Sequence, residues 1–208
     1  MRRVSPAEFV LAHTRVRHAP FVPEVRLHLA DDSLELWEAT QLAVERGDLP
    51  PPFWAFVWAG GQALARYVLD HPEVVAGKRI HDLATGSGVV AIAAAKAGAA
   101  QVTVSDVDPA AVAAAMRNAA ANEVEIVAGE PAAEVVLAGD VFYSPAVAPG
   151  MTARLRQARR DAAEVLVGDP GRGYFPQRLF QQLTAYVVPV PPALEETESL
   201  ATGVWRMR

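Results

Sequence analysis

Short apolar runs alternate with stretches of helical pattern through the middle of the chain. The runs at 79–83 and 101–105 are typical of buried strands, and the small residues at 89–97 predict a helix between them. Gly98 follows that helix, where a left-handed C-terminal cap is expected. A tight loop at 84–88, which contains two glycines, joins the first strand to the helix. The pattern therefore predicts a β-α-β unit.

The alternation continues towards the C-terminus. Asp108 followed by Pro109 predicts an N-cap and a first helical residue, so a helix is expected up to Asn122. The segment 128–133 is too short to hold a full helix. The other expected elements are strands at 124–127, 135–138, 164–168, 187–190 and 201–207, and helices at 149–160 and 176–186. The chain thus ends in a strand-turn-strand unit instead of another β-α repeat.

The first fifty residues follow a different pattern. A capping box with proline at the first helical position, at 5–8, predicts a short helix, and residues 33–46 predict a second one. Residues 25–29 alternate between apolar and charged side chains and could form a strand or a docking arm. Three prolines at 50–52 form a stiff break. We therefore expect an N-terminal arm, 1–50, and a main domain, 51–208.

Aromatic side chains are dense at 53–61, ahead of a helix expected at 62–69. Aromatic residues in such a stretch most often belong to the core. The alternative is a flap over a bound ligand, in which Trp58 and the glycines after it would contact the ligand and exclude water. Both interpretations stay open at this point.

The composition narrows the classes of function. The 208 residues carry a formal net charge of −5 and include no cysteine. The charge argues against binding to a phosphate backbone, and the lack of cysteine excludes disulfides and cysteine-ligated zinc. The five histidines lack metal-ligand spacing, and no apolar run approaches the length of a membrane span. We therefore expect a soluble, cytoplasmic protein without a metal, which acts on a protein or a small molecule and not on nucleic acid.

The glycine loop predicts a ligand shaped like a nucleotide. Gly86 and Gly88 would let backbone N–H groups approach it at a helix N-terminus, and Asp106 would accept hydrogen bonds from ribose hydroxyls. The segment 86–91 also fits the dinucleotide fingerprint G-x-G-x-x-A. Asp82, however, stands on the strand before the loop, where it would repel a pyrophosphate. It would attract the ammonium and sulfonium charges of S-adenosylmethionine, which the pattern therefore favours.

Two further strand ends carry polar side chains. Asp140 and Tyr143 follow one strand, and Asp169 and Arg172 follow the next. In open α/β sheets, ligands collect at the carboxyl ends of the strands. We therefore expect both pairs to face the same crevice as the glycine loop, with ordinary turn chemistry as the alternative for either pair alone.

Taken together, these residues resemble the seven-stranded class I S-adenosylmethionine-dependent methyltransferases. The segments that carry the resemblance are D-L-A-T-G-S-G at 82–88, V-S-D-V-D-P at 104–109 and G-D-V-F-Y at 139–143. More narrowly, the chain is similar to the lysine methyltransferases of the electron-transfer flavoprotein β-subunit and their bacterial relatives. The segments that carry this similarity are V-P-E-V-R-L at 22–27, the stretch from P-F-W-A at 52–55 through W-A-G-G-Q-A-L at 58–64, G-D-V-F-Y at 139–143 and V-G-D-P-G-R at 167–172. The similarity runs from about residue 22 to the C-terminus.

The resemblance implies a Rossmann-like α/β fold, with a seven-stranded sheet, helices on both faces and a C-terminal antiparallel hairpin, to which the small N-terminal helical arm is added. The cofactor-binding residues that it implies are Trp58, Gly61, Asp82, Ala84, Thr85, Gly86, Gly88, Asp106, Val107 and Asp140. Ala84 stands where the class usually has a glycine. The short connection at 128–133 leaves the residue that contacts adenine unassigned.

The resemblance also implies an acceptor side and an activity. Asp140 and Tyr143 would border the target amine as catalytic residues, and Asp169 and Arg172 would bind the substrate. We expect transfer of the methyl group of S-adenosylmethionine to a lysine of a protein, with S-adenosylhomocysteine as product. A small-molecule N-methyltransferase, an NAD-linked oxidoreductase and a non-catalytic nucleotide-binding module stay open, and the oligomeric state is unknown.

Overall fold

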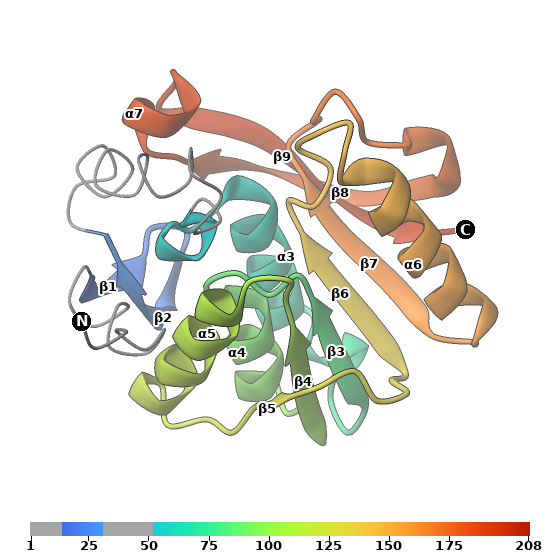
Figure 1. The fold of residues 1–208 in the computed structure, drawn as a ribbon, viewed down its shortest axis with the longest axis horizontal. Coiled ribbons are helices and arrows are strands. Elements are labelled where there is room, and N and C mark those ends of the chain that lie inside the picture. The colour runs from blue at the N-terminus through green and yellow to red at the C-terminus, as the bar shows by residue number, and fades with distance from the viewer. Residues whose placement is uncertain (1–13, 31–51) are drawn as a thin grey trace, which may run out of the picture.

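The computed structural model describes residues 14–30 and 52–208, and a seven-stranded sheet lies at its centre (Figure 1). The strands are β3 (Arg79–Leu83), β4 (Gln101–Ser105), β5 (Val127–Ala128), β6 (Val135–Gly139), β7 (Glu164–Asp169), β8 (Phe180–Pro189) and β9 (Ser199–Met207). Their order is β5-β4-β3-β6-β7-β9-β8. The first five are parallel, and β9 is antiparallel to both of its neighbours. The predicted fold class, with its C-terminal antiparallel hairpin, is confirmed.

Helices cover both faces of this sheet. They are α3 (Ala59–Asp70), α4 (Val89–Lys96), α5 (Pro109–Ala121), α6 (Ala148–Arg160) and the short α7 (Pro192–Glu195), with 3-10 turns η1 (Phe53–Ala55), η2 (Pro72–Val74) and η3 (Gln177–Leu179). Successive strand residues point to opposite faces, so Leu137 packs in the core with α3 and α4, while Val136 packs with Leu155 of α6. As predicted, the connection at 129–134 between β5 and β6 holds no helix.

The helix predicted at 176–186 is wrong, because this segment forms η3 and most of β8. Its apolar side chains at 179, 180, 183 and 186 have the spacing of a helix face, which explains the prediction. In the structure the backbone pairs instead with the whole of β9, from Phe180 opposite Met207 to Pro189 opposite Ser199. Tertiary pairing has therefore overridden the local pattern. The strand expected at 187–190 is the end of β8.

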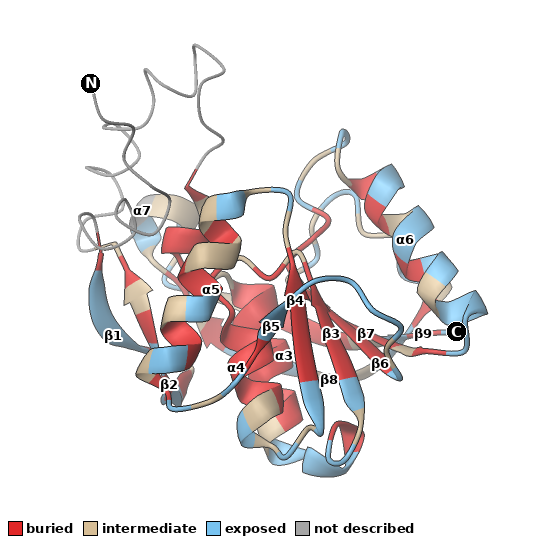
Figure 2. Ribbon diagram, turned by 60° about the horizontal axis from the view of Figure 1, so that its bottom comes forward, coloured by how far each residue is buried: buried red, intermediate tan, exposed pale blue. Residues whose placement is uncertain are grey.

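Residues 15–29 form a β-hairpin of β1 (Arg15–Ala19) and β2 (Val22–Leu29). Val25, Leu27 and Leu29 of β2 are buried in the same core as α3 and α4. Two asparagines of α5 and its C-terminus bind the β2 backbone: Asn118 Oδ1 accepts from His28 N–H, and Asn122 bonds both polar groups of Arg26. The segment 25–29, expected as a strand or a docking arm, is therefore a strand that packs against α5 and the core (Figure 2).

The helices predicted at 5–8 and onwards and at 33–46 lie outside the described residues, as do the first two prolines of the break at 50–52. The division of the chain near residue 50 accordingly stays a prediction. Within residues 14–30 and 52–208, none of the helices combines the length and the apolar character that crossing a membrane requires.

Candidate active site

A cavity of about 590 Å³ opens at the carboxyl ends of β3, β4 and β6. This volume lies within the usual range for a small-ligand site. Its wall is mostly apolar, and the glycine loop, the start of α3 and the loops after β6 and β7 contribute to it. Parallel strands deliver their following residues to one edge of the sheet, which is why segments distant in sequence meet here.

The glycine loop takes backbone conformations that favour glycine. Gly86 and Gly88 have φ values of 51° and 79°, and Gly88 is the N-cap of α4. A Cβ on Gly86 would meet no atom within 4 Å, so the loop leaves open space on that side. Ala84 also has a positive φ, 58°, at a cost of roughly 1–2 kcal/mol. The alanine is thus accommodated in the conformation that a glycine would adopt.

Asp82 lies beneath this loop and is 1% exposed. Its Oδ2 accepts hydrogen bonds from Thr85 Oγ1 at 2.7 Å and from Ala91 N–H at 3.2 Å. Burial raises the pKa of this carboxyl from 3.8 to about 7, although the two hydrogen bonds oppose the change. A cation placed in the cavity next to Asp82 would therefore stabilise the ionised carboxylate.

Asp106 and Asp108 have the two different positions that the sequence predicted. Asp106 lines the cavity, and its carboxylate accepts hydrogen bonds from Gly86 N–H and Asp108 N–H, each at 3.0 Å. Asp108 caps α5 by accepting from Ala110 N–H at 2.8 Å. Between them, Val107 lines the cavity and is 93% exposed, so an apolar side chain faces the ligand space from this side.

The start of α3 is packed tightly against the ends of β6 and β7. A Cβ on Gly60 would lie 2.3 Å from the carbonyl oxygen of Gly168, so only glycine fits there. Asp140, directly after β6, has a φ of 59°, and its Oδ2 accepts from Gly60 N–H at 3.0 Å. The carboxylate thus lies at the N-terminal end of α3, where the helix dipole favours negative charge.

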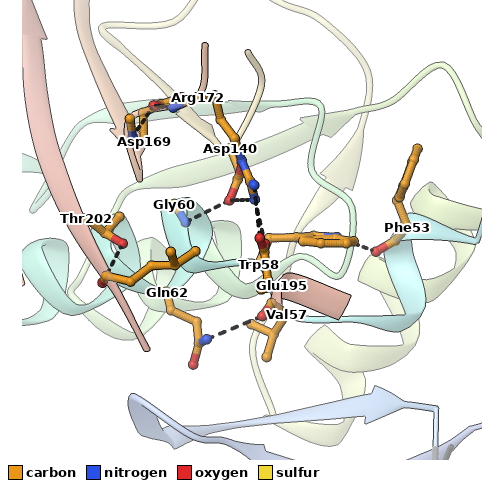
Figure 3. A network of polar contacts seen from close by, with 12 residues as sticks. Phe53, Val57, Trp58, Gly60, Gln62, Asp140, Asp169, Arg172, Glu195 and Thr202 are labelled. Carbon is orange, nitrogen blue, oxygen red and sulfur yellow. Dashed lines mark hydrogen bonds and ion pairs between the residues drawn. The ribbon is translucent and has the colours of Figure 1, made fainter. Parts of the chain in front are cut away.

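Arg172 joins Asp140 to a residue that the sequence did not single out, Glu195 of α7 (Figure 3). Its Nε donates to Asp140 Oδ1 at 2.8 Å, and its Nη2 donates to Glu195 Oε1 at 2.6 Å. Asp169 holds the turn that carries Arg172: its Oδ1 accepts hydrogen bonds from the backbone N–H groups of Gly171 and Arg172. Burial raises the pKa of Asp169 to about 6.

Aromatic rings form another part of the cavity wall. The Trp58 indole donates its Nε1–H to the Phe53 carbonyl at 2.9 Å (Figure 3), and the Phe53 ring lies 5.4 Å from the Tyr143 ring. Tyr143 is 46% exposed and lines the cavity. Burial, with the charges of Asp106 and Asp140, raises its pKa, so the phenol stays neutral. Aromatic residues at 53–61 thus serve the core and the cavity together.

The structure brings most of the predicted site residues together. The cavity is lined by Trp58, Gly61, Asp82, Ala84, Thr85, Gly86, Asp106, Val107, Asp140, Tyr143 and Arg172. Gly88 and Asp169 are not in its lining: Gly88 starts α4, and Asp169 supports the turn that carries Arg172. Among residues 14–30 and 52–208, no group of three histidine, aspartate or glutamate side chains could hold a metal.

Glu195 and Phe53 are two of the cavity-lining residues that the sequence does not single out. Glu195 follows a pair of prolines in a stretch with several glutamates, and nothing in that pattern distinguishes it. Phe53 belongs to the aromatic stretch at 53–61, in which the sequence predicts a ligand contact for only one aromatic residue, Trp58.

The amino-acid sequence is similar to those of known proteins. The family model of ribosomal protein L11 methyltransferase (PrmA) matches residues 62–144. A protein of Xenopus laevis named electron transfer flavoprotein beta subunit lysine methyltransferase is 37% identical over 180 residues, which cover 82% of this chain and 72% of that protein. The protein of that name from Danio rerio is 33% identical over 213 residues, covering 95% and 81%.

A solved structure agrees with the fold. Magnesium protoporphyrin IX methyltransferase from Synechocystis PCC 6803, with bound S-adenosylmethionine, has a TM-score of 0.52 and 13% sequence identity. The match covers 70% of this chain and 76% of that one. At this identity the similarity concerns the fold alone.

Proposed function

The chain belongs to the family of the electron transfer flavoprotein beta subunit lysine methyltransferases, and from this membership we propose that it methylates lysine side chains of a protein, with S-adenosylmethionine as methyl donor. Electron transfer flavoprotein beta subunit is the acceptor that the relatives' name indicates, and we propose it as the first acceptor to test. The observation that carries the proposal is one continuous cavity with Asp82 under the glycine loop and Asp140 with Tyr143 at another part of its wall.

The residues of the cavity fit this cofactor. Asp82 is a buried carboxylate that a nearby cation would ionise, which suits an ammonium or sulfonium and disfavours a pyrophosphate. Asp106 presents carboxylate oxygens for ribose hydroxyls. Val107, Trp58 and Gly61 would cover the cofactor with apolar surface and exclude water. We propose that these residues, with Ala84, Thr85, Gly86 and Gly88 of the loop, form the cofactor site.

Asp140 and Tyr143 would serve the acceptor. S-adenosylmethionine supplies a methyl group on a positively charged sulfur, so the protein mainly has to align a free amine with it in a dry site. The amine lone pair forms the new N–C bond while the C–S bond breaks and leaves its electron pair on sulfur. The ring of Tyr143 can face the amine or the methylammonium product, a contact worth roughly 0.5–2 kcal/mol. Asp140 can accept a hydrogen bond from the amine.

Incubation with methyl-labelled S-adenosylmethionine tests the proposal. The purified chain is mixed with recombinant electron transfer flavoprotein beta subunit, and label is followed by gel and by peptide mass spectrometry. We expect label on lysine residues of the acceptor. Label that appears only in small molecules of a cell extract would favour a small-molecule N-methyltransferase instead.

A binding measurement separates the remaining alternatives. Calorimetry with S-adenosylhomocysteine and with NADH is expected to show binding of the first and none of the second. Binding of NADH alone would favour an oxidoreductase. Binding of S-adenosylhomocysteine without transfer to any acceptor, protein or small, would favour a non-catalytic module.

A further inference from the structure

The pairing of Asp140 with Arg172 bears on a difficulty in methylating lysine. The amine must lose its proton before it can react, and the reference pKa of lysine is about 10.4. A bare carboxylate beside the amine would favour the ammonium form further. Asp140 at the cavity wall would therefore hinder the reaction if its charge were uncompensated.

Arg172 supplies the compensation. Its Nε and Nη2 contact the two oxygens of Asp140 at 2.8 and 3.3 Å, so the guanidinium spans the carboxylate. Its other edge binds Glu195, with Nη1–Oε2 at 3.0 Å and Nη2–Oε1 at 2.6 Å. The side chains of Asp140 and Glu195 are 4% and 9% exposed, so water screens these contacts little.

The guanidinium is held as a permanent cation. Burial works against its charge, but hydrogen bonds to Glu195 and Asp140 outweigh burial and raise the pKa of Arg172 above its ordinary value. Two carboxylates, those of Asp140 and Glu195, bind it directly. Loss of the guanidinium would therefore leave the acceptor side of the cavity with uncompensated negative charge.

We propose that Arg172 is a positioning residue of the methyl transfer: it neutralises Asp140, so that the carboxylate can accept a hydrogen bond from the acceptor amine without holding that amine as an ammonium ion. Glu195 keeps the guanidinium in place from α7. This inference rests on the proposed function, since it concerns the amine that is methylated there.

Other charged or titratable groups also face the cavity, but each is bound to another partner or lies at another part of the wall. Tyr143 stays neutral, and Asp169 is bound by backbone N–H groups of the turn at 171–172. Asp82 and Asp106 line the cavity near the glycine loop, and Arg154 of α6 pairs with Glu130. The charge next to Asp140 is thus set first by Arg172 and Glu195.

The test is the pH dependence of single-turnover methylation, because rates in the bound complex report the ionisation of the bound amine. The acceptor is electron transfer flavoprotein beta subunit at saturation, and the variants are Arg172→Met, Arg172→Lys and Glu195→Gln. The rate rises with pH as the bound amine loses its proton, and this rise is the limb of the profile that we follow. We expect Arg172→Met to move the limb to higher pH by about one to three units. Arg172→Lys keeps the charge and should leave the limb near that of the wild type.

Glu195→Gln removes one negative charge and should move the limb to lower pH, the opposite direction. It also tests the proposal if the Arg172→Met variant does not fold, which circular dichroism would reveal. The matched control is Arg206→Met, which breaks another arginine–carboxylate pair, to Glu164, at the far end of β7. The control should leave the limb unchanged.

Binding gives a second readout. Calorimetry of the acceptor against the S-adenosylhomocysteine complex at pH 7 should show that Arg172→Met binds it at least as tightly as the wild type, while its rate is about tenfold lower or more. Affinity for S-adenosylhomocysteine itself should stay within about threefold. An unshifted limb in both Arg172→Met and Glu195→Gln would overturn the proposal. A wild-type chain that methylates no lysine would instead overturn the proposed function.

Discussion

The carboxylate of Asp140 and the guanidinium of Arg172 are 2.8 Å apart, from Oδ1 to Nε, although 32 positions separate them in the chain. Neighbouring parallel strands, β6 and β7, bring the two together at their carboxyl ends. The turn after β7, with Gly171 at a φ of 86°, then directs Arg172 back over β6. Sheet topology thus brings the two strand-end pairs to one edge of the sheet, as expected, and the structure adds the direct contact between Asp140 and Arg172.

Asp140→Asn is expected to separate catalysis from cofactor binding. The asparagine can still accept a hydrogen bond from Gly60 N–H, so the start of α3 should be preserved. The amide nitrogen of asparagine cannot accept from Arg172, so the hydrogen-bonded arrangement that aligns the acceptor amine is lost, and methyl transfer should fall about 100-fold. Single-turnover rates and calorimetry with S-adenosylhomocysteine check this. Equal loss of transfer and of affinity would make Asp140 a cofactor residue instead.

Tyr143 is expected to act through its ring and not through its hydroxyl. Tyr143→Phe keeps the ring next to Phe53 and should change the transfer rate less than about threefold. Tyr143→Ala removes the ring and should reduce the rate about tenfold or more. Measured rates that rank the two variants as equally poor would assign the effect to the hydroxyl.

Much of the fold could be predicted because its signals are local. The strand at 79–83, the loop at 84–88 and the N-cap at Asp108 each follow from a few neighbouring residues, and all are present. The segment 176–186 fails for the opposite reason: its helical spacing is local, whereas its pairing with β9 depends on residues about twenty positions away. Local pattern and tertiary contact disagree there, and the contact wins.

The candidate site shows the same limit. Asp82, Asp106 and Asp140 could be predicted as site residues because each lies near the carboxyl end of a strand or directly after it. In a parallel sheet these ends meet at one edge. Glu195 could not, since it enters the cavity from a short helix whose place depends on the β8–β9 hairpin. The close contact between Gly60 and Gly168 likewise could not be predicted from the sequence around either glycine, because it depends on how α3 packs against β7.

The buried carboxylate of Asp82 predicts a pH dependence of stability. Its pKa rises on folding from 3.8 to about 7, so the folded protein binds this proton more tightly than the unfolded chain. The free energy of unfolding from this group therefore falls as pH rises from about 4 to about 7, by about 4 kcal/mol at most. Without ligand, this contribution appears as the difference in thermal melting between the wild type and a variant that lacks the carboxylate, measured over this range.

Asp82→Asn removes that dependence and keeps an oxygen that can accept from Thr85 and Ala91. The variant should melt at least about 4 °C above the wild type at pH 8 and close to it at about pH 4. Its affinity for S-adenosylhomocysteine, measured by calorimetry, should fall at least about tenfold. Parallel melting profiles for the two proteins would show that the carboxylate is not the source of the dependence.

Gly60→Ala is expected to destabilise the protein strongly. The added Cβ would lie 2.3 Å from the Gly168 carbonyl oxygen and 2.6 Å from the Asp140 backbone nitrogen, both of them backbone atoms that cannot move aside cheaply. We expect a loss of about 3 kcal/mol in the free energy of unfolding, measured with urea. Gly150→Ala is the matched control: its Cβ would meet nothing within 4 Å, and alanine should stabilise α6 by up to about 1 kcal/mol.

Asn122 is expected to hold the N-terminal hairpin on the main domain. Its Oδ1 accepts from Arg26 N–H at 2.9 Å, and its Nδ2 donates to the Arg26 carbonyl at 2.6 Å. Asn122→Ala leaves both backbone groups without these partners and should cost about 2–3 kcal/mol. Asn122→Asp keeps the acceptor and loses the donor, so its cost should be intermediate.

Amide hydrogen exchange locates this effect. In Asn122→Ala, exchange of the β2 amides should rise more than exchange of the amides of β6 and β7, because the hairpin loses two of its hydrogen bonds to α5 and the central sheet loses none. Gln157→Ala, which removes an exposed contact with Asp161, should change stability by less than about 0.5 kcal/mol. An equal rise of exchange throughout the chain would mean that the hairpin unfolds only together with the central sheet, and that Asn122 stabilises the whole domain as one cooperative unit.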